Sequence, residues 1–280
     1  MRFQQSILGF KRARYLQVAA ALSAAAIVIY AWYDPPLPHP KAYGGTWVGY
    51  TLGTLAAALV VWLLFLGVRK RSYRSTLGTV QGWTSAHVYL GLSVLLIATL
   101  HCAFEFGWNI HTYAYALLVA VVASGMAGVF AYLRFPRLLT RNMGEDTIET
   151  LALKIADLDR QCAELAVPLP ERVNAVVKHA QRARIGGGFA QRLTGNAVRC
   201  PTRAACEALR RLGASLTGEQ AALHQQLVLA MTRRSVLLDR ARRDLQLNAW
   251  LQIWLYLHVP LSFALVAALI AHVIAVFYFW

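Results

Sequence analysis

The chain of 280 residues is 58% hydrophobic, has a formal net charge of +15 and a mean hydropathy of +0.44. Its apolar residues lie in long runs, which is typical of membrane proteins and argues against a soluble domain. The four cysteines form no CxxC pair and no CxxCH sequence, so neither a zinc knuckle nor a covalently attached c-type haem is indicated.

Five segments are long enough to cross roughly 30 Å of hydrocarbon as helices, at about 20 residues each. Because only helices and closed barrels satisfy the backbone in lipid, and the runs show no strand-like alternation, we predict an all-α integral membrane protein. The first run lacks a clear cleavage site and is interpreted as an anchor. The predicted spans are Leu16–Trp32, Trp47–Val68, Trp83–Phe106, Thr112–Leu133 and Trp250–Phe279.

The basic residues orient these spans. Every lysine and arginine except Lys41 falls in the N-terminal tail, in the loop after the second span or in the long segment after the fourth. By the positive-inside rule these parts are cytoplasmic, so we predict a multi-pass protein of the inner (cytoplasmic) membrane with its N-terminus in the cytoplasm. Topology thus accounts for the basic charge, and nucleic-acid binding is not expected.

A long segment separates the fourth span from the fifth. Its apolar residues recur at helical spacing over Thr147–Leu165 and Glu219–Leu247, which predicts a helical cytoplasmic insertion between helices four and five. The predicted domains are transmembrane helices one to four (1–133), this insertion (134–247) and transmembrane helix five (248–280), which completes the bundle.

Four of the eight histidines lie in predicted spans, His87 and His101 in the third, His258 and His272 in the fifth. Both spans read Trp-x3-His-x13-His. Over the His-to-His spacing an α-helix stops about 40° short of four full turns and rises roughly 21 Å. Each span therefore presents two imidazoles on nearly one face, one in each leaflet of the membrane.

The predicted orientation makes the third and fifth spans parallel. His87 then lies at the depth of His258, and His101 at the depth of His272. Imidazole is a good ligand for iron, and two axial ligands give a six-coordinate electron-transfer site. We therefore expect each depth-matched pair to hold the iron of one haem b, as inner and outer haem.

The alternative is that these histidines have only a structural role and form hydrogen bonds between helices. Four ionisable residues in spans, paired by spacing and depth, are better explained by function. One shared zinc or copper ion is disfavoured, because ligands roughly 21 Å apart cannot meet at one ion. Glycines in the second, third and fourth spans, such as Gly53, Gly91 and Gly125, provide room for a flat macrocycle or for close helix packing.

The other histidines receive a different interpretation. His111 lies at the outer mouth of the fourth span and is expected to be a solvated interface residue; contact with the outer haem's propionates or with a docking partner is the alternative. His39, His179 and His224 are expected at the surface.

The paired His-x13-His pattern on two helices resembles the di-haem b-type membrane cytochromes, including the transmembrane domain of ferric reductases and NADPH oxidases, and is similar to cytochrome b subunits of quinol-linked oxidoreductases. The resemblance covers residues 47–133 and 250–280. It implies two haem b cofactors and axial ligand roles for His87, His101, His258 and His272. We expect no flavin and nicotinamide domain after the last span, and therefore an electron-transfer subunit of an oxidoreductase complex.

The expected function is electron transfer across the membrane through these two haems. The expected partners are a cytoplasmic iron–sulfur or flavin protein docking on 134–247, and a membrane or periplasmic electron partner, a c-type cytochrome or a quinone. One alternative is a quinol- or quinone-reactive cytochrome b subunit. Another, of a different class, is a non-redox membrane anchor or scaffold, which would be colourless.

Overall fold

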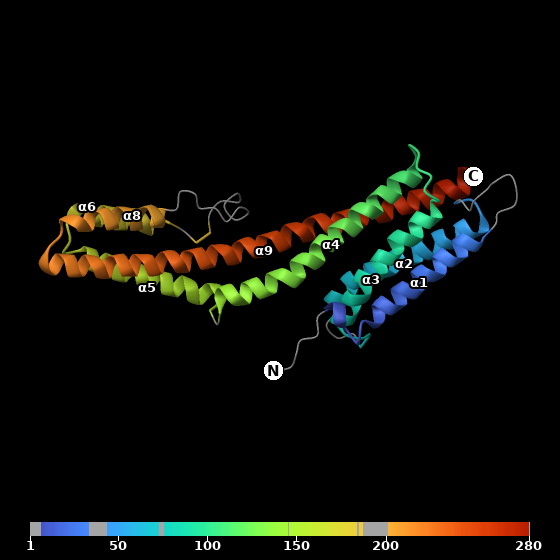
Figure 1. Ribbon diagram of the computed structural model, residues 1–280. Helices are drawn as coiled ribbons and strands as arrows, with labels where there is room; N and C mark the ends of the chain where they lie inside the picture. Colours follow the sequence, from blue (N-terminus) through green and yellow to red (C-terminus); the bar gives the residue numbers. More distant parts are fainter. Residues whose placement is uncertain are drawn as a thin grey trace. The chain divides into compact units, whose positions relative to one another are not determined.

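The computed structural model describes residues 7–33, 44–72, 76–144, 146–183, 185–186 and 201–279 (Figure 1). Within these ranges every regular element is a helix, and five helices are long and apolar enough to cross a membrane. The predicted all-α membrane fold is thereby confirmed. These helices are α1 (Arg14–Trp32), α2 (Trp47–Arg71), α3 (Val80–His101), α4 (Ile110–Met143) and α9 (Gly218–Phe279).

The chain divides into two compact units, which are described separately. The first consists of Met1–Phe130 and Trp254–Trp280, and the second of Ala131–Ile253. The predicted borders of the insertion, after residue 133 and before residue 248, fall inside α4 and α9. The reason is that both helices continue without a break where the apolar run gives way to a charged, amphipathic one. A separately bounded insertion therefore stays a prediction.

In the first unit, helix ends follow local chemistry. Threonine side chains at Thr46 and Thr79 accept hydrogen bonds from backbone N–H groups of the first turns of α2 and α3, at 3.1 Å each. Helix α3 ends at His101, earlier than the predicted Phe106. Ala103 and Phe104 have φ angles of 50° and 62°, which an α-helix cannot accommodate.

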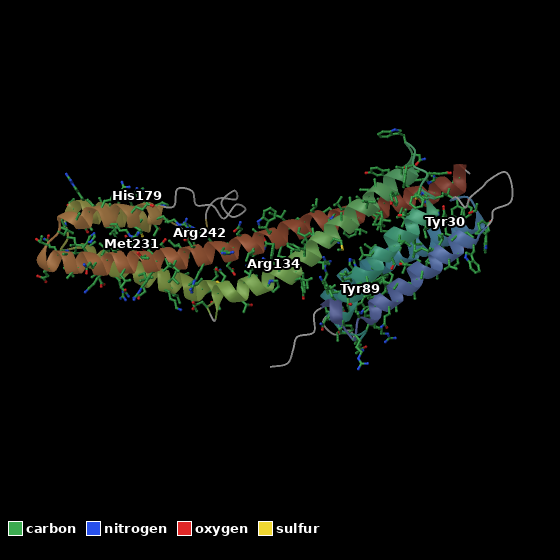
Figure 2. The ribbon with its side chains drawn as sticks, viewed as in Figure 1. Tyr30, Tyr89, Arg134, His179, Met231 and Arg242 are labelled. Atoms are coloured by element: carbon green, nitrogen blue, oxygen red, sulfur yellow. The ribbon has the colours of Figure 1, made fainter. Side chains whose placement is uncertain are left out.

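The core of the first unit joins all five apolar helices. Ser93 on α3 donates to the carbonyl of Ala19 on α1 at 3.1 Å. Tyr89, labelled in Figure 2, donates to the carbonyl of Leu8 at 2.9 Å. Many large apolar side chains point outward, as expected for helices surrounded by lipid. The buried members of this core are Ala26, Val48, Leu52, Ala56, Val60, Val94, Ile97, Leu118 and Leu265.

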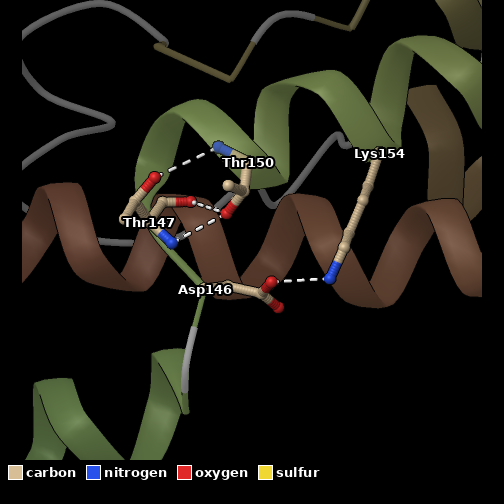
Figure 3. Close-up of polar contacts among 4 residues, drawn as sticks. All are labelled: Asp146, Thr147, Thr150 and Lys154. Atoms are coloured by element: carbon tan, nitrogen blue, oxygen red, sulfur yellow. Dashed lines mark hydrogen bonds and ion pairs between the residues drawn. The ribbon is translucent and has the colours of Figure 1, made fainter.

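The second unit packs α5 (Ile148–Ala166), α6 (Glu171–Gln181) and α8 (Pro201–Leu212) with the first part of α9. Thr147 and Thr150 form a capping box at the start of α5, with reciprocal hydrogen bonds of 3.2 and 2.7 Å (Figure 3). The apolar stripe predicted over Thr147–Leu165 forms the buried face of α5. Its core includes Leu158, Cys162, Val173, Val177, Leu209, Leu227 and Met231.

Among the described residues of this unit, three polar ones are buried: Thr202, His224 and Arg234. Arg234 is 1% exposed and donates to Asp159 at 2.6 Å and to Thr202 at 2.7 Å. His224, which we expected at the surface, is 5% exposed and donates from Nε2 to the carbonyl of Leu209 at 2.9 Å. That expectation was wrong, because residue 224 shares the buried face of α9 with Leu227 and Met231.

His179 and His39 were also expected at the surface. His179 on α6 is exposed, as expected (Figure 2). His39 lies outside the described residues.

Candidate functional site

The four histidines of the two Trp-x3-His-x13-His segments face each other in pairs within the first unit. The ring centre of His87 on α3 lies 6.4 Å from that of His258 on α9, with the ring planes at 70°. The ring centre of His101 lies 6.0 Å from that of His272, with the planes at 90°. We name these the His87 pair and the His101 pair. The first histidine of α3 faces the first of α9, and the second faces the second. Helix α3 and this part of α9 therefore run in the same direction.

The ring separation distinguishes these pairs from hydrogen-bonded histidines. Two imidazoles on opposite sides of one metal ion, each with a metal–nitrogen bond of about 2 Å, have their ring centres roughly 6 Å apart. Both pairs have this separation, and the described hydrogen bonds join no two members of a pair. By contrast, His111 and His272 are hydrogen-bonded directly, with nitrogens 2.5 Å apart and ring centres 4.5 Å apart.

Helix α2 orients both rings of α3. Nδ1 of His87 donates to the carbonyl of Leu63 at 3.1 Å, and Nδ1 of His101 donates to the carbonyl of Gly49 at 2.8 Å. A carbonyl oxygen can only accept, so Nδ1 carries the proton in both rings. In a neutral imidazole this leaves the lone pair on Nε2, which is the form that binds a metal.

Helix α4 orients both rings of α9. Ser124 Oγ lies 2.7 Å from Nδ1 of His258 and donates its own hydrogen to the carbonyl of Val121 at 2.8 Å, so it accepts from the imidazole. Nδ1 of His272 lies 2.5 Å from Nδ1 of His111. All four imidazoles therefore use Nδ1 for a hydrogen bond, and no hydrogen bond to their Nε2 atoms is described.

Glycines allow these close approaches. A Cβ added at Gly53 would lie 2.7 Å from Cε1 of His101, which is too close for the ring to keep its place, whereas one at Gly125 would make an ordinary contact of 3.5 Å with Cε1 of His258. A Cβ added at Gly128 would collide with the indole of Trp254. The predicted role of the glycines in close packing therefore applies here to the histidine rings themselves.

The two tryptophans of the repeated motif have different surroundings. Trp254 donates from Nε1 to the carbonyl of Ser124 at 2.7 Å and stacks on His258, with ring centres 5.5 Å apart and planes at 23°. Trp83 instead donates to the carbonyl of Leu77 at 2.5 Å and stacks on Trp62. The two copies of the sequence motif thus place their histidines in equivalent positions, but their tryptophans contact different residues.

A partly open cavity of about 90 Å³ lies beside the His87 pair. Its wall is almost entirely apolar, with His87, His258 and Ser262 as the polar contributors. Gly91 and Gly125 leave it open where a larger side chain would fill it. Aliphatic lining residues include Val60, Leu63, Val94, Leu118, Val121 and Leu265.

Among the described residues, no group of three or more His, Cys, Asp or Glu side chains could hold a bare metal ion. Each histidine pair offers two ligands, which is the number that a six-coordinate haem iron takes from the protein. Fold and site together define an all-α, multi-pass membrane protein with two facing histidine pairs. The chain matches no protein-family model, no curated protein and no solved structure. Its function is therefore inferred from the chemistry of these side chains.

Proposed function

We propose that the protein is a di-haem b-type cytochrome that carries electrons across a membrane as a subunit of a larger redox complex. His87 and His258 hold one haem b, and His101 and His272 hold the other. The observation that carries this proposal is the common arrangement of the four imidazoles. Each uses Nδ1 for a hydrogen bond, and each faces its partner at the separation of two ligands of one ion.

The surroundings of the His87 pair support a flat, apolar cofactor. The adjoining cavity has apolar walls, and Gly91 and Gly125 supply its open positions. When bound between two imidazoles, haem b supplies reversible one-electron exchange at its iron. A six-coordinate iron of this kind has no position left for a substrate, so electron transfer fits the ligand set better than catalysis at the metal.

The residues of the chain then have definable tasks. The carbonyls of Leu63 and Gly49 and the hydroxyl of Ser124 fix the orientation and the protonated nitrogen of three of the rings. Hydrogen bonds of this kind also increase the basicity of a ligating imidazole and so contribute to the redox potential. Apolar side chains of α2, α3 and α4 line the cavity beside the His87 pair.

The orientation and the partners belong to the same proposal. The distribution of lysines and arginines supports a cytoplasmic N-terminus in the inner membrane, with 134–247 on the cytoplasmic side. In this proposal an iron–sulfur or flavin protein docks on that segment. The electron partner on the other side is a c-type cytochrome or a quinone.

Haem quantitation and a reduced-minus-oxidised spectrum test the proposal on the full chain purified after haem-replete expression. We expect two b haems per chain. His87→Ala and His258→Ala should each remove the same haem, and His101→Ala and His272→Ala the other. His179→Ala, which changes an exposed histidine, is the control and should retain both. A colourless wild-type protein would refute the proposal and favour a membrane anchor.

A further inference from the structure

His111 differs from the groups that orient the other three rings. Those groups are two backbone carbonyls and a serine hydroxyl, whereas Nδ1 of His272 meets the Nδ1 of a second imidazole at 2.5 Å. His111 is the second residue of α4 and is partly exposed. Its ring stands nearly perpendicular to that of His272, at 89°.

His111 is not placed to share a metal ion with His272. Two nitrogens bound to one ion, each at about 2 Å on opposite sides, lie roughly 4 Å apart. At 2.5 Å the two nitrogens are closer than two ligands of one ion, and they are joined by a hydrogen bond. His101, with its ring centre 6.0 Å from that of His272, has the separation expected for the second ligand.

We infer that His111 is a positioning residue for the haem held by the His101 pair. It accepts the Nδ1 proton of His272 and so turns the lone pair of Nε2 toward His101. This inference rests on the proposed function and deepens it. It gives His111 a role through a ligand, in place of the solvated interface position or the propionate contact that the sequence suggested.

The proton count links this hydrogen bond to ligation. Two facing Nδ1 atoms can share one hydrogen. If His111 donated it, neutral His272 would carry its own proton on Nε2 and could not bind iron through that nitrogen. When His272 donates, His111 in its neutral form carries its proton on Nε2. For His272 to act as a ligand through Nε2, His111 must therefore be the acceptor of this hydrogen bond and not its donor.

Two variants of the full chain separate acceptance from packing. His111→Leu removes the acceptor and keeps a side chain of moderate size, whereas His111→Gln supplies an amide oxygen that can accept. His179→Leu is the matched control at an exposed histidine of the second unit. The readouts are haem content, redox titration that resolves both haems, and the rate of haem transfer to excess apomyoglobin. The His101→Ala variant identifies which spectral component belongs to the His101 pair.

Loss of an outer hydrogen-bond partner typically lowers metal-site affinity about 10- to 100-fold. We expect His111→Leu to release the haem of the His101 pair at least about tenfold faster, and to shift its midpoint potential, with the other haem unchanged. His111→Gln should restore retention. Wild-type behaviour of His111→Leu, equal loss of both haems, or failure of His111→Gln to improve on His111→Leu would overturn the inference. Any of these results with two haems in the wild type leaves the proposed function standing.

Discussion

The hydroxyl of Ser124 on α4 accepts a 2.7 Å hydrogen bond from Nδ1 of His258 on α9. The backbone carbonyl of the same serine accepts from the indole of Trp254, which stacks on the His258 ring. Ser124 therefore holds both the imidazole of His258 and the indole of Trp254 that stacks on it.

Replacing Ser124 by Ala should weaken the His87 site selectively. The variant leaves the Nδ1 proton of His258 without its acceptor, and we expect the haem held by this pair to bind about 10- to 100-fold more weakly. Haem retention and the difference spectrum measure the effect. Thr51→Ala is the control, because that exposed hydroxyl lies on α2 and donates to the backbone carbonyl of Trp47. Equal losses at both haems would contradict the prediction.

Replacing Gly53 by Ala should disturb the His101 site. The added methyl group would come within 2.7 Å of the His101 ring, so that the ring or α2 must move. We expect loss or spectral change of the haem held by the His101 pair, with the His87 pair retained. Gly67→Ala on the same helix is a matched control, since a Cβ there meets nothing within 4 Å. A Gly53→Ala protein with two normal haems would show that the ring is not held against α2.

Removing Asp159 should destabilise the second unit. Asp159→Ala leaves the charge of buried Arg234 without its carboxylate, a change that typically costs about 3–5 kcal/mol. Asp157→Ala, two residues earlier on α5, breaks an exposed pair with Arg160 and should cost far less, because water screens that pair. The urea concentration at which the full chain in detergent becomes protease-sensitive within 147–215 measures the difference. Equal midpoints for the two variants would contradict it.

The Cys162 thiol should resist alkylation in the folded protein. Burial, reinforced by the nearby Asp159 charge, raises its pKa from an ordinary 9.0 to about 11. Each pH unit changes the thiolate fraction about tenfold, so at pH 8 the reactive thiolate is roughly a hundredfold rarer than for an ordinary cysteine. Iodoacetamide labelling followed by peptide mass spectrometry should therefore find Cys206, which is less buried, modified first.

The sign of the linkage follows from the raised pKa. The folded unit favours the neutral thiol, so this group favours folding most below pH 9, and that advantage is lost as the pH rises towards 11. Labelling of Cys162 should accelerate over the same interval. Equal rates for Cys162 and Cys206 at pH 8 would refute the assignment.

Hydropathy located the spans because burial in lipid is decided by local composition. The beginning of α2 at Trp47 and the end of α1 at Trp32 agree with the predicted limits. Where a helix continued past its apolar run, as α4 and α9 do, composition could not mark the end. The early end of α3 depends on the left-handed residues Ala103 and Phe104, for which the sequence carries no glycine signal.

The pairing of the histidines followed from spacing and orientation alone, since a periodic pattern on two parallel helices predicts which residues lie at equal depth. Their hydrogen-bond partners could not be derived in this way. The partners of His87 and His101 are the backbone carbonyls of Leu63 and Gly49. Every residue has such a carbonyl, so the sequence does not mark these two, and contact with them depends on how α2 packs on α3. Ser124 and His111 stand out in the sequence as polar residues in a mostly apolar span. The sequence does not show, however, which histidine ring each of them contacts.

Each histidine pair takes one ring from α3, held by α2, and one from α9, held by α4. A ligand bound by either pair therefore links α2 and α3 to α4 and α9. The His87 pair and the His101 pair would form this link at two different heights along the same helices. Ligand binding to the native arrangement stabilises it by mass action. Occupancy of one pair would also align the rings of the other, so that filling the first site prepares the second.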